Sequence, residues 1–71
     1  MPKLYSSSRI TRVLRRHGFS LVGQKGSHAK FRQAGKRERN VIVPMNRREI
    51  PCGTFHSILR QCGLKEADFK R

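Results

Sequence analysis

The sequence predicts an α+β fold in which both helices cover one face of a three-stranded antiparallel sheet, in the order α-β-β-β-α. Apolar residues recur at helical spacing near both ends of the chain and alternate with polar residues in between. Glycine and proline residues separate these segments. A chain of 71 residues can bury only a small core. We therefore expect one two-layer domain over residues 1–71, with no internal repeat or linker. Its expected core residues are Ile10, Val13, Leu14, Phe19, Leu21, Phe31, Val41, Ile42, Val43, Phe55, Ile58, Leu59 and Leu64.

The first helix is expected over residues 9–17. Its apolar side carries Ile10, Val13 and Leu14, and arginines occupy much of the rest. The serines at positions 6–8 offer N-caps, because a serine hydroxyl accepts a hydrogen bond from a free amide of the first turn. Gly18 is expected to end the helix in a left-handed conformation. Tyr5 precedes the helix and is expected in a frayed N-terminus.

Three strands should follow, over residues 19–24, His28–Gln33 and 39–43. A turn at residues 25–27 joins the first two, and a hairpin connection at residues 34–37 joins the last two. Alternation in the middle strand directs His28, Lys30 and Arg32 to one face and Ala29, Phe31 and Gln33 to the other. One face of the sheet is therefore cationic, and Phe31 belongs to the core rather than to a base-stacking surface.

The second helix is expected over residues 55–62, after a loop at residues 45–52 bounded by Pro44 and Pro51. Thr54 is the expected N-cap, and Gly63 the residue that ends the helix. Arg47 and Arg48 lie in the middle of the loop. Leu64 and Phe69 flank a short terminal turn that should pack back on the core.

The charge of the chain indicates an anionic partner. It carries 17 Lys and Arg against 4 Asp and Glu, a formal net charge of +13. Such a surface attracts nucleic acid or an acidic protein. The apolar runs are too short for a membrane span or a signal peptide, so a cytoplasmic protein is expected. Cys52 and Cys62 are interpreted as reduced, semi-buried residues, with a disulfide as the alternative, and no metal-ligand spacing or cofactor motif is present.

The residues that carry chemistry cluster around Gly26-Ser27-His28. A histidine exchanges a proton near neutral pH, and neighbouring cations bind phosphate. From the residues alone, His28 is either a proton-transfer group or a half-exposed strand histidine that only binds phosphate or backbone. His17 is expected to cap the first helix, and His56 to lie on a solvated helix face. The candidate phosphate-binding residues are Lys25, Ser27, Lys30, Arg32, Arg47 and Arg48.

Several linked motifs resemble those of the HicA toxins, the RNA-cleaving components of HicA–HicB toxin–antitoxin pairs. They are Gly18-Phe19, Gln24-Lys25-Gly26-Ser27-His28, Val43-Pro44, Ile50-Pro51-x-Gly53-Thr54, and Ser57-Ile58-Leu59 followed by Gly63-Leu64. The resemblance implies a fold like double-stranded-RNA-binding domains, ribonuclease activity on mRNA, and an acidic HicB-like antitoxin that masks the active surface. It also implies that His28 is catalytic. Members often carry a histidine shortly after the strand-ending proline, where this chain has Met45-Asn46.

The expected function is therefore an endoribonuclease toxin that cuts mRNA without a metal ion and leaves a 2′,3′-cyclic phosphate. RNA supplies its own nucleophile, so a protein needs only to move protons and stabilise charge on the phosphate. The second proton-transfer group is open among Lys25, His56 and water. The alternative is a non-catalytic RNA-binding module of the same fold. A DNA-binding regulator is disfavoured, because no helix presents base-reading Asn or Gln residues.

Overall fold

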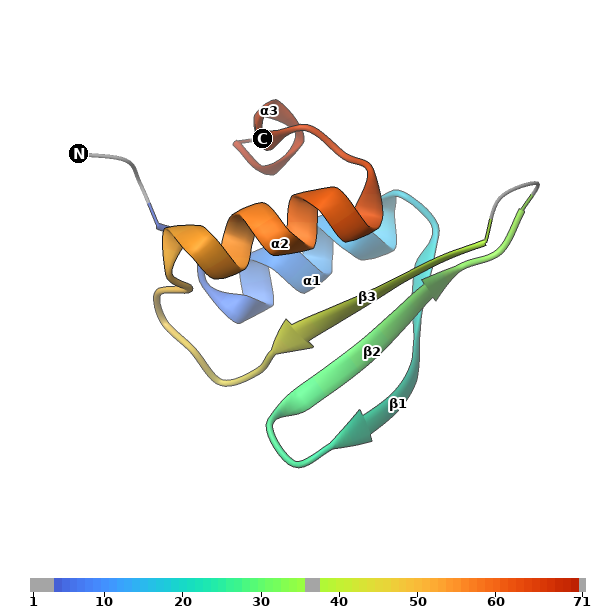
Figure 1. The fold of residues 1–71 in the computed structure, drawn as a ribbon, viewed down its shortest axis with the longest axis horizontal. Coiled ribbons are helices and arrows are strands. Elements are labelled where there is room, and N and C mark those ends of the chain that lie inside the picture. Colours follow the sequence, from blue (N-terminus) through green and yellow to red (C-terminus); the bar gives the residue numbers. More distant parts are fainter. Residues whose placement is uncertain (1–3, 36–37, 71) are drawn as a thin grey trace.

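The computed structural model describes residues 4–35 and 38–70, and its elements follow the predicted order (Figure 1). The elements are α1 (Ser7–Arg16), β1 (Phe19–Lys25), β2 (His28–Gln33), β3 (Arg39–Pro44), α2 (Cys52–Cys62) and the short α3 (Glu66–Phe69). The expected hairpin connection at residues 34–37 lies partly outside the described residues. None of the described helices is both long and apolar enough to cross a bilayer.

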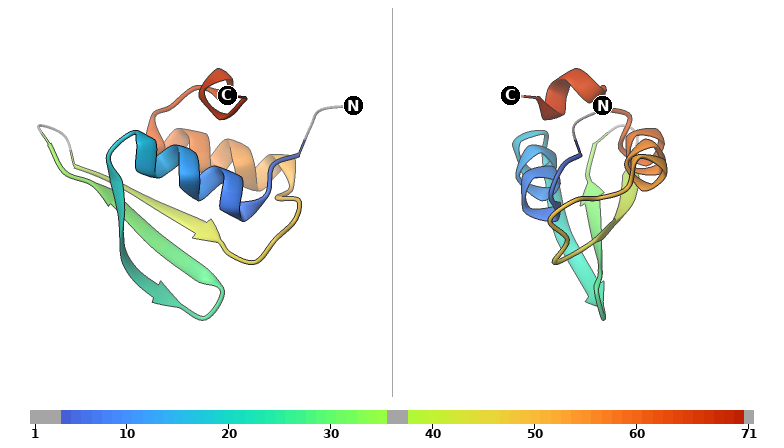
Figure 2. Two further views of the ribbon diagram at one scale, coloured as in Figure 1. Left: turned by 180° about the vertical axis from the view of Figure 1, so that it is seen from behind. Right: turned by 90° about the vertical axis from the view of Figure 1, so that its left-hand side faces the viewer.

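The sheet is antiparallel, with β2 between β1 and β3. Both helices lie on one face of it, as predicted, with α1 on the β1 side and α2 along β3 (Figure 2). At one end of β2, His28 pairs with Lys25 of β1 and with Pro44 of β3. The two-layer α+β fold with a three-stranded antiparallel sheet is confirmed, and it resembles that of double-stranded-RNA-binding domains.

The helix ends show which local signals are decisive. The Ser6 hydroxyl accepts a hydrogen bond from the Arg9 amide at 3.1 Å, so α1 starts at Ser7, earlier than expected. Gly63 ends α2 as expected, and it does so in a left-handed conformation with φ of 73°. The predicted Thr54 cap is wrong, because Pro51 stands at the cap position without a side-chain bond and α2 starts at Cys52. The φ of Pro51, −57°, is compatible with the start of a helix. Because α2 starts at Cys52, Thr54 lies inside its first turn.

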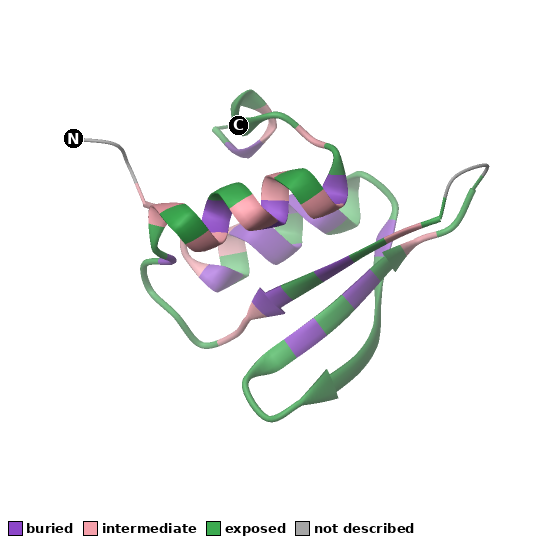
Figure 3. Ribbon diagram, viewed as in Figure 1, coloured by how far each residue is buried: buried purple, intermediate pink, exposed green. Residues whose placement is uncertain are grey.

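The core lies between the helices and the inner face of the sheet (Figure 3). Of its expected members, Leu59 and Leu64 are only partly buried and pack against it, and Leu21 and Ile42 are exposed. Ile42 is 40% exposed, because its neighbours in β3 point inward and alternation turns it outward. Leu21 is 46% exposed, because β1 runs beyond the cover of α1 after Phe19. A register shift between Leu21 and Gly23 marks a bulge in β1. The observed buried apolar residues are Tyr5, Ile10, Val13, Leu14, Phe19, Ala29, Phe31, Val41, Val43, Ile50, Phe55, Ile58, Cys62 and Phe69.

Aromatic residues from both ends of the chain close this core beneath α3. The ring centroids of Tyr5 and Phe55 lie 5.0 Å apart, and Phe69 meets Phe55 edge-on at 5.2 Å. Tyr5 is 4% exposed, and its carbonyl accepts a hydrogen bond from the Ile50 amide at 2.8 Å. The frayed N-terminus expected at Tyr5 is therefore wrong. Phe69 packs back on the core as predicted.

The two cysteines are free thiols. Cys62 is buried on the inner side of α2, and burial raises the pKa of its thiol, because the thiolate loses its solvation. Cys52 is partly exposed at the start of the same helix. Cys52 is semi-buried as expected, whereas Cys62 is more deeply buried than expected.

Candidate functional site

A cleft of about 320 Å³ opens where α2 runs past the edge of β3. Its walls come from four parts of the chain: β2, β3, the loop between β3 and α2, and α2 itself. The residues that line it are His28, Ile42, Pro44, Arg47, Pro51, Thr54, Ser57 and Gln61. We refer to it as the α2–β3 cleft.

His28 occupies the strand end of this cleft. It is the first residue of β2, directly after a turn in which Gly26 has a φ of 58°, a conformation that favours glycine. The next residue, Ala29, is fully buried on the inner face of the sheet. Alternation therefore places the His28 side chain on the outer face, where it is exposed to solvent. The predicted orientation of this strand is confirmed.

Arg47 reaches the same cleft from the loop, and one buried serine holds the loop in place. The Ser7 hydroxyl donates to the Pro44 carbonyl at 2.6 Å and accepts from the Arg47 amide at 3.1 Å. The Ser7 amide donates to the Arg47 carbonyl at 2.9 Å. Ser7 is 2% exposed. This Ser7 clasp therefore fixes the backbone of Arg47 next to the end of β3, where Arg47 lines the same cleft as His28.

Replacing Ser7 with alanine should lower the free energy of unfolding by about 1–3 kcal/mol, because the Pro44 carbonyl and the Arg47 amide lose a buried partner. Urea unfolding followed by circular dichroism measures this change. Ser8→Ala is the matched control, because Ser8 is exposed and, among the described residues, its hydroxyl bonds only to the Ser6 hydroxyl, at 3.2 Å. Equal stability of the two variants would show that the clasp does not hold the loop.

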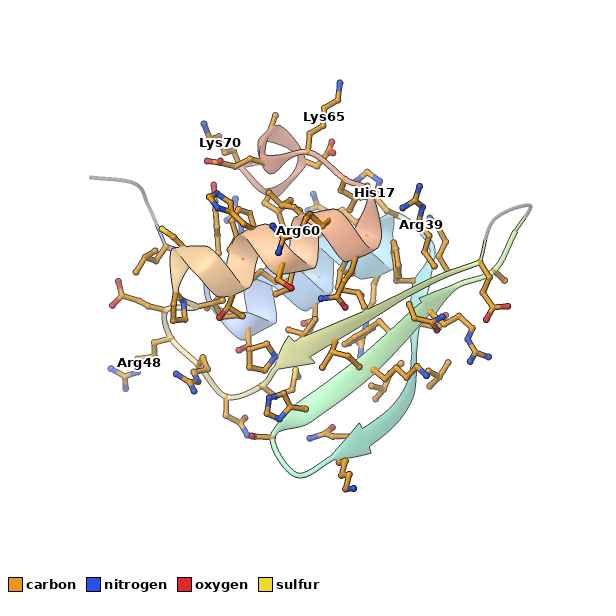
Figure 4. All side chains as sticks on the ribbon, in the orientation of Figure 1. His17, Arg39, Arg48, Arg60, Lys65 and Lys70 are labelled. Atoms are coloured by element: carbon orange, nitrogen blue, oxygen red, sulfur yellow. The ribbon has the colours of Figure 1, made fainter. Side chains whose placement is uncertain are left out.

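The other predicted phosphate-binding residues differ in how close they lie to His28. Lys25 is its direct partner on β1, and Lys30 follows two positions along β2 on the same face, about 7 Å away. The Ser27 carbonyl accepts from the Met45 amide at 2.6 Å, which joins the β1–β2 turn to the loop after β3. Arg48 is exposed and points away from the body of the molecule (Figure 4).

Arg32 is not brought to His28. It lies four positions along β2, about 13 Å away. Its Nε atom is 3.1 Å from Glu38 and 3.1 Å from the Asn40 side-chain oxygen. Of the predicted phosphate-binding side chains, Arg47 therefore shares the cleft with His28, Lys25 and Lys30 border His28, and Arg32 and Arg48 lie farther out.

Arg47 gives the cleft a positive charge. None of its lining residues, all of which belong to the described part of the chain, is acidic. Of the four acidic residues, Glu38 pairs with Arg32, and the Asp68 carboxylate accepts from the Lys65 amide at 2.9 Å. Lys65 and Lys70, which flank α3, lie on the far side of the helices from the β1–β2 turn (Figure 4). Within residues 4–35 and 38–70, no three His, Cys, Asp or Glu side chains are grouped to hold a metal ion.

The α2 wall of the cleft was missed by the sequence analysis. Thr54, Ser57 and Gln61 are spaced by three and four residues, so they share one face of the helix. This polar stripe was visible in the sequence, next to the apolar stripe. It carried no signal of function, because its position beside β3 depends on how α2 packs.

A comparison with protein-family models identifies the family of this chain. The family described as "HicA toxin of bacterial toxin-antitoxin" matches residues 7–64, which include every residue that lines the cleft. A search of curated proteins gives no match to this chain.

Proposed function

This chain belongs to the HicA toxin family and is the toxin of a toxin–antitoxin system, and we propose that it is an endoribonuclease that cleaves mRNA. One observation carries the proposal: an exposed histidine and an arginine share a cleft that no acidic side chain lines. A proton-transfer group beside a phosphate-binding group is what RNA cleavage requires. The family membership supports the same conclusion.

In the proposed reaction the 2′-oxygen of the substrate attacks the adjacent phosphorus and the bond to the 5′-oxygen breaks. One proton leaves the 2′-hydroxyl and another reaches the departing 5′-oxygen, so the products are a 2′,3′-cyclic phosphate and a 5′-hydroxyl. The His28 imidazole carries one of these transfers. Arg47 donates hydrogen bonds to the phosphate oxygens as negative charge develops on them.

The outer face of the sheet is proposed to bind the RNA on either side of the cleavage point. Lys25 and Lys30 flank His28, and Arg32 extends the cationic row along β2. Ser27 in the turn and Arg48 in the loop contribute at its margins. Such contacts follow the sugar–phosphate backbone and read no base. Their affinity for RNA should fall steeply as the salt concentration rises.

The proposed antitoxin is an acidic HicB-like protein that covers this face in the cytoplasm. The net charge of +13 gives the toxin a strong attraction for such a partner. Because RNA and antitoxin are both attracted to the cationic surface around His28, a bound antitoxin excludes RNA from the cleft.

The test is cleavage of a defined RNA by the purified protein in excess EDTA. We expect full cleavage and products that end in a 2′,3′-cyclic phosphate. A matched RNA with one 2′-deoxynucleotide at the cleavage point should stay intact there, because it lacks the attacking oxygen. Cleavage of the deoxy substrate, or activity that only Mg²⁺ restores, would contradict the mechanism. RNA that is bound but never cut would favour the non-catalytic RNA-binding module.

A further inference from the structure

The α2 wall of the cleft has no role in the reaction described above, although it supplies three of the eight lining residues. Thr54, Ser57 and Gln61 follow one another along the helix, from its first turn to its last. They face the strand end that carries His28 and Pro44. Any group that enters the cleft beside His28 therefore meets this row of neutral polar side chains.

Hydrogen bonds fix this wall against the sheet. The Gln61 side-chain oxygen accepts from the Ile42 amide of β3 at 3.0 Å. The Gln61 side-chain nitrogen donates to the Ser57 hydroxyl oxygen at 3.1 Å. Because Ser57 accepts in that bond, its own hydroxyl proton is left to donate elsewhere. The Thr54 hydroxyl makes no hydrogen bond within the described part of the chain, so two hydroxyls face the cleft ready for a ligand.

Three of the remaining residues that line the cleft are apolar: Ile42, Pro44 and Pro51. Ile42 is 40% exposed on the outer face of the sheet, although isoleucine is usually buried. Pro44 and Pro51 stand at the two ends of the loop that carries Arg47. A volume of about 320 Å³ is at the lower end of the range for small-ligand sites, about 300–1,000 Å³. The cleft therefore has the size and the mixed apolar and polar lining that suit one small group.

We infer that the α2 wall, formed by Thr54, Ser57 and Gln61, binds the base of the nucleotide next to the cleaved phosphate. The base rests on Ile42 and the prolines, and its polar edge meets the Thr54 and Ser57 hydroxyls. The inference rests on the proposed ribonuclease function. The α2 wall lies in the same cleft as His28 and Arg47. A phosphate bound by these two residues would therefore place its own nucleoside against the rest of the cleft.

This arrangement gives the toxin a preference for certain bases at one position of its cleavage site. Backbone contacts along the sheet accept any sequence, whereas hydroxyl groups discriminate between the donor and acceptor patterns of base edges. A hydrogen bond of ordinary strength changes the preference for one base by about two- to tenfold. The preference should be confined to the nucleotide adjacent to the cut.

The test is digestion of an RNA pool of random sequence, with the cut ends mapped by sequencing. We expect Thr54→Val and Ser57→Ala to change base frequencies at one position beside the cut by about two- to tenfold and to leave other positions unchanged. Ser57→Thr, which keeps the hydroxyl, should retain the wild-type preference. Ser20→Ala is the control, because Ser20 is exposed opposite Arg32, outside the cleft. Unchanged frequencies in both wall variants would overturn the inference and leave the ribonuclease proposal standing.

A binding measurement separates this inference from the proposed function. Fluorescence polarisation of labelled hexanucleotides of A, C, G or U is measured with the His28→Ala protein, with and without Thr54→Val and Ser57→Ala. We expect the affinities for the four RNAs to differ and the two further substitutions to remove that difference. If the wild-type protein never cuts RNA, the ribonuclease proposal fails, and these affinities alone show whether the α2 wall binds a base. Affinities that the wall substitutions do not alter would overturn the inference of a base-binding wall.

Discussion

Replacing His28 with alanine should lower the rate of RNA cleavage by about 10²–10⁴-fold, the range that a positioned acid or base supplies. The His28 side chain is exposed at the end of the α2–β3 cleft, so its loss removes a proton-transfer group without opening a cavity in the core. RNA affinity should change little, because Lys25, Lys30 and Arg47 remain. Induced expression of the variant should no longer degrade cellular RNA or inhibit growth.

His56→Ala is the matched control for this loss. His56 is an exposed histidine on α2 that does not line the cleft. Single-turnover cleavage and RNA affinity, measured at the same salt concentration for the three proteins, separate catalysis from binding. A His28→Ala protein that still cuts RNA at the wild-type rate would disprove the assigned role. A rate loss in His56→Ala would instead identify that residue as the second proton-transfer group.

The largest loss of stability is expected from Phe69→Ala. Phe69 is fully buried, meets Phe55 edge-on, and lies with its ring centroid 6.3 Å from that of Tyr5. Its carbonyl also accepts a hydrogen bond from the Arg9 side chain at 3.1 Å. Truncation of a buried phenylalanine costs about 3–5 kcal/mol. A domain of this size is stable by about 5–10 kcal/mol, so the variant should lose a large share of its stability.

Urea unfolding of Phe69→Ala and Phe69→Leu tests this expectation. The leucine variant keeps most of the apolar volume and should lose less than half as much stability as the alanine variant. Similar unfolding curves for wild type and Phe69→Ala would show that α3 does not contribute to the core. Because Phe69 lies outside the matched residues 7–64, the outcome also measures how much one side chain beyond the family region adds to stability.

Patterns that act over a few residues predicted most of the fold. Alternation in β2 placed His28 outside and Phe31 inside, because successive side chains of a strand point to opposite faces. Gly18 and Gly63, with φ of 89° and 73°, ended the helices as expected, because glycine adopts left-handed backbone conformations at little cost. The roles of His28 and of the phosphate-binding residues remain predictions, although the structure shows where their side chains lie.

Contacts between distant parts of the chain were not predictable in the same way. The Ser7 clasp joins residues 37 and 40 positions apart, and nothing local distinguishes Ser7 from its serine neighbours. Tyr5 and Ile50 are buried together because the N-terminal segment lies against the loop before α2. The α2–β3 cleft likewise depends on how α2 packs. Thr54 was expected to cap this helix, but it lies inside the helix and lines the cleft.

The bond between Gln61 and β3 also limits how the sheet can extend into other molecules. Backbone amide groups on an antiparallel strand point alternately to its two edges. The positions of residues 40, 42 and 44 therefore share the edge of β3 that points away from β2. Gln61 accepts from the Ile42 amide, and Pro44 has no amide hydrogen to donate. A foreign strand approaching this border of the sheet finds one available donor, at Asn40. Intermolecular strand pairing, the first step towards aggregation, is thereby discouraged beside the cleft.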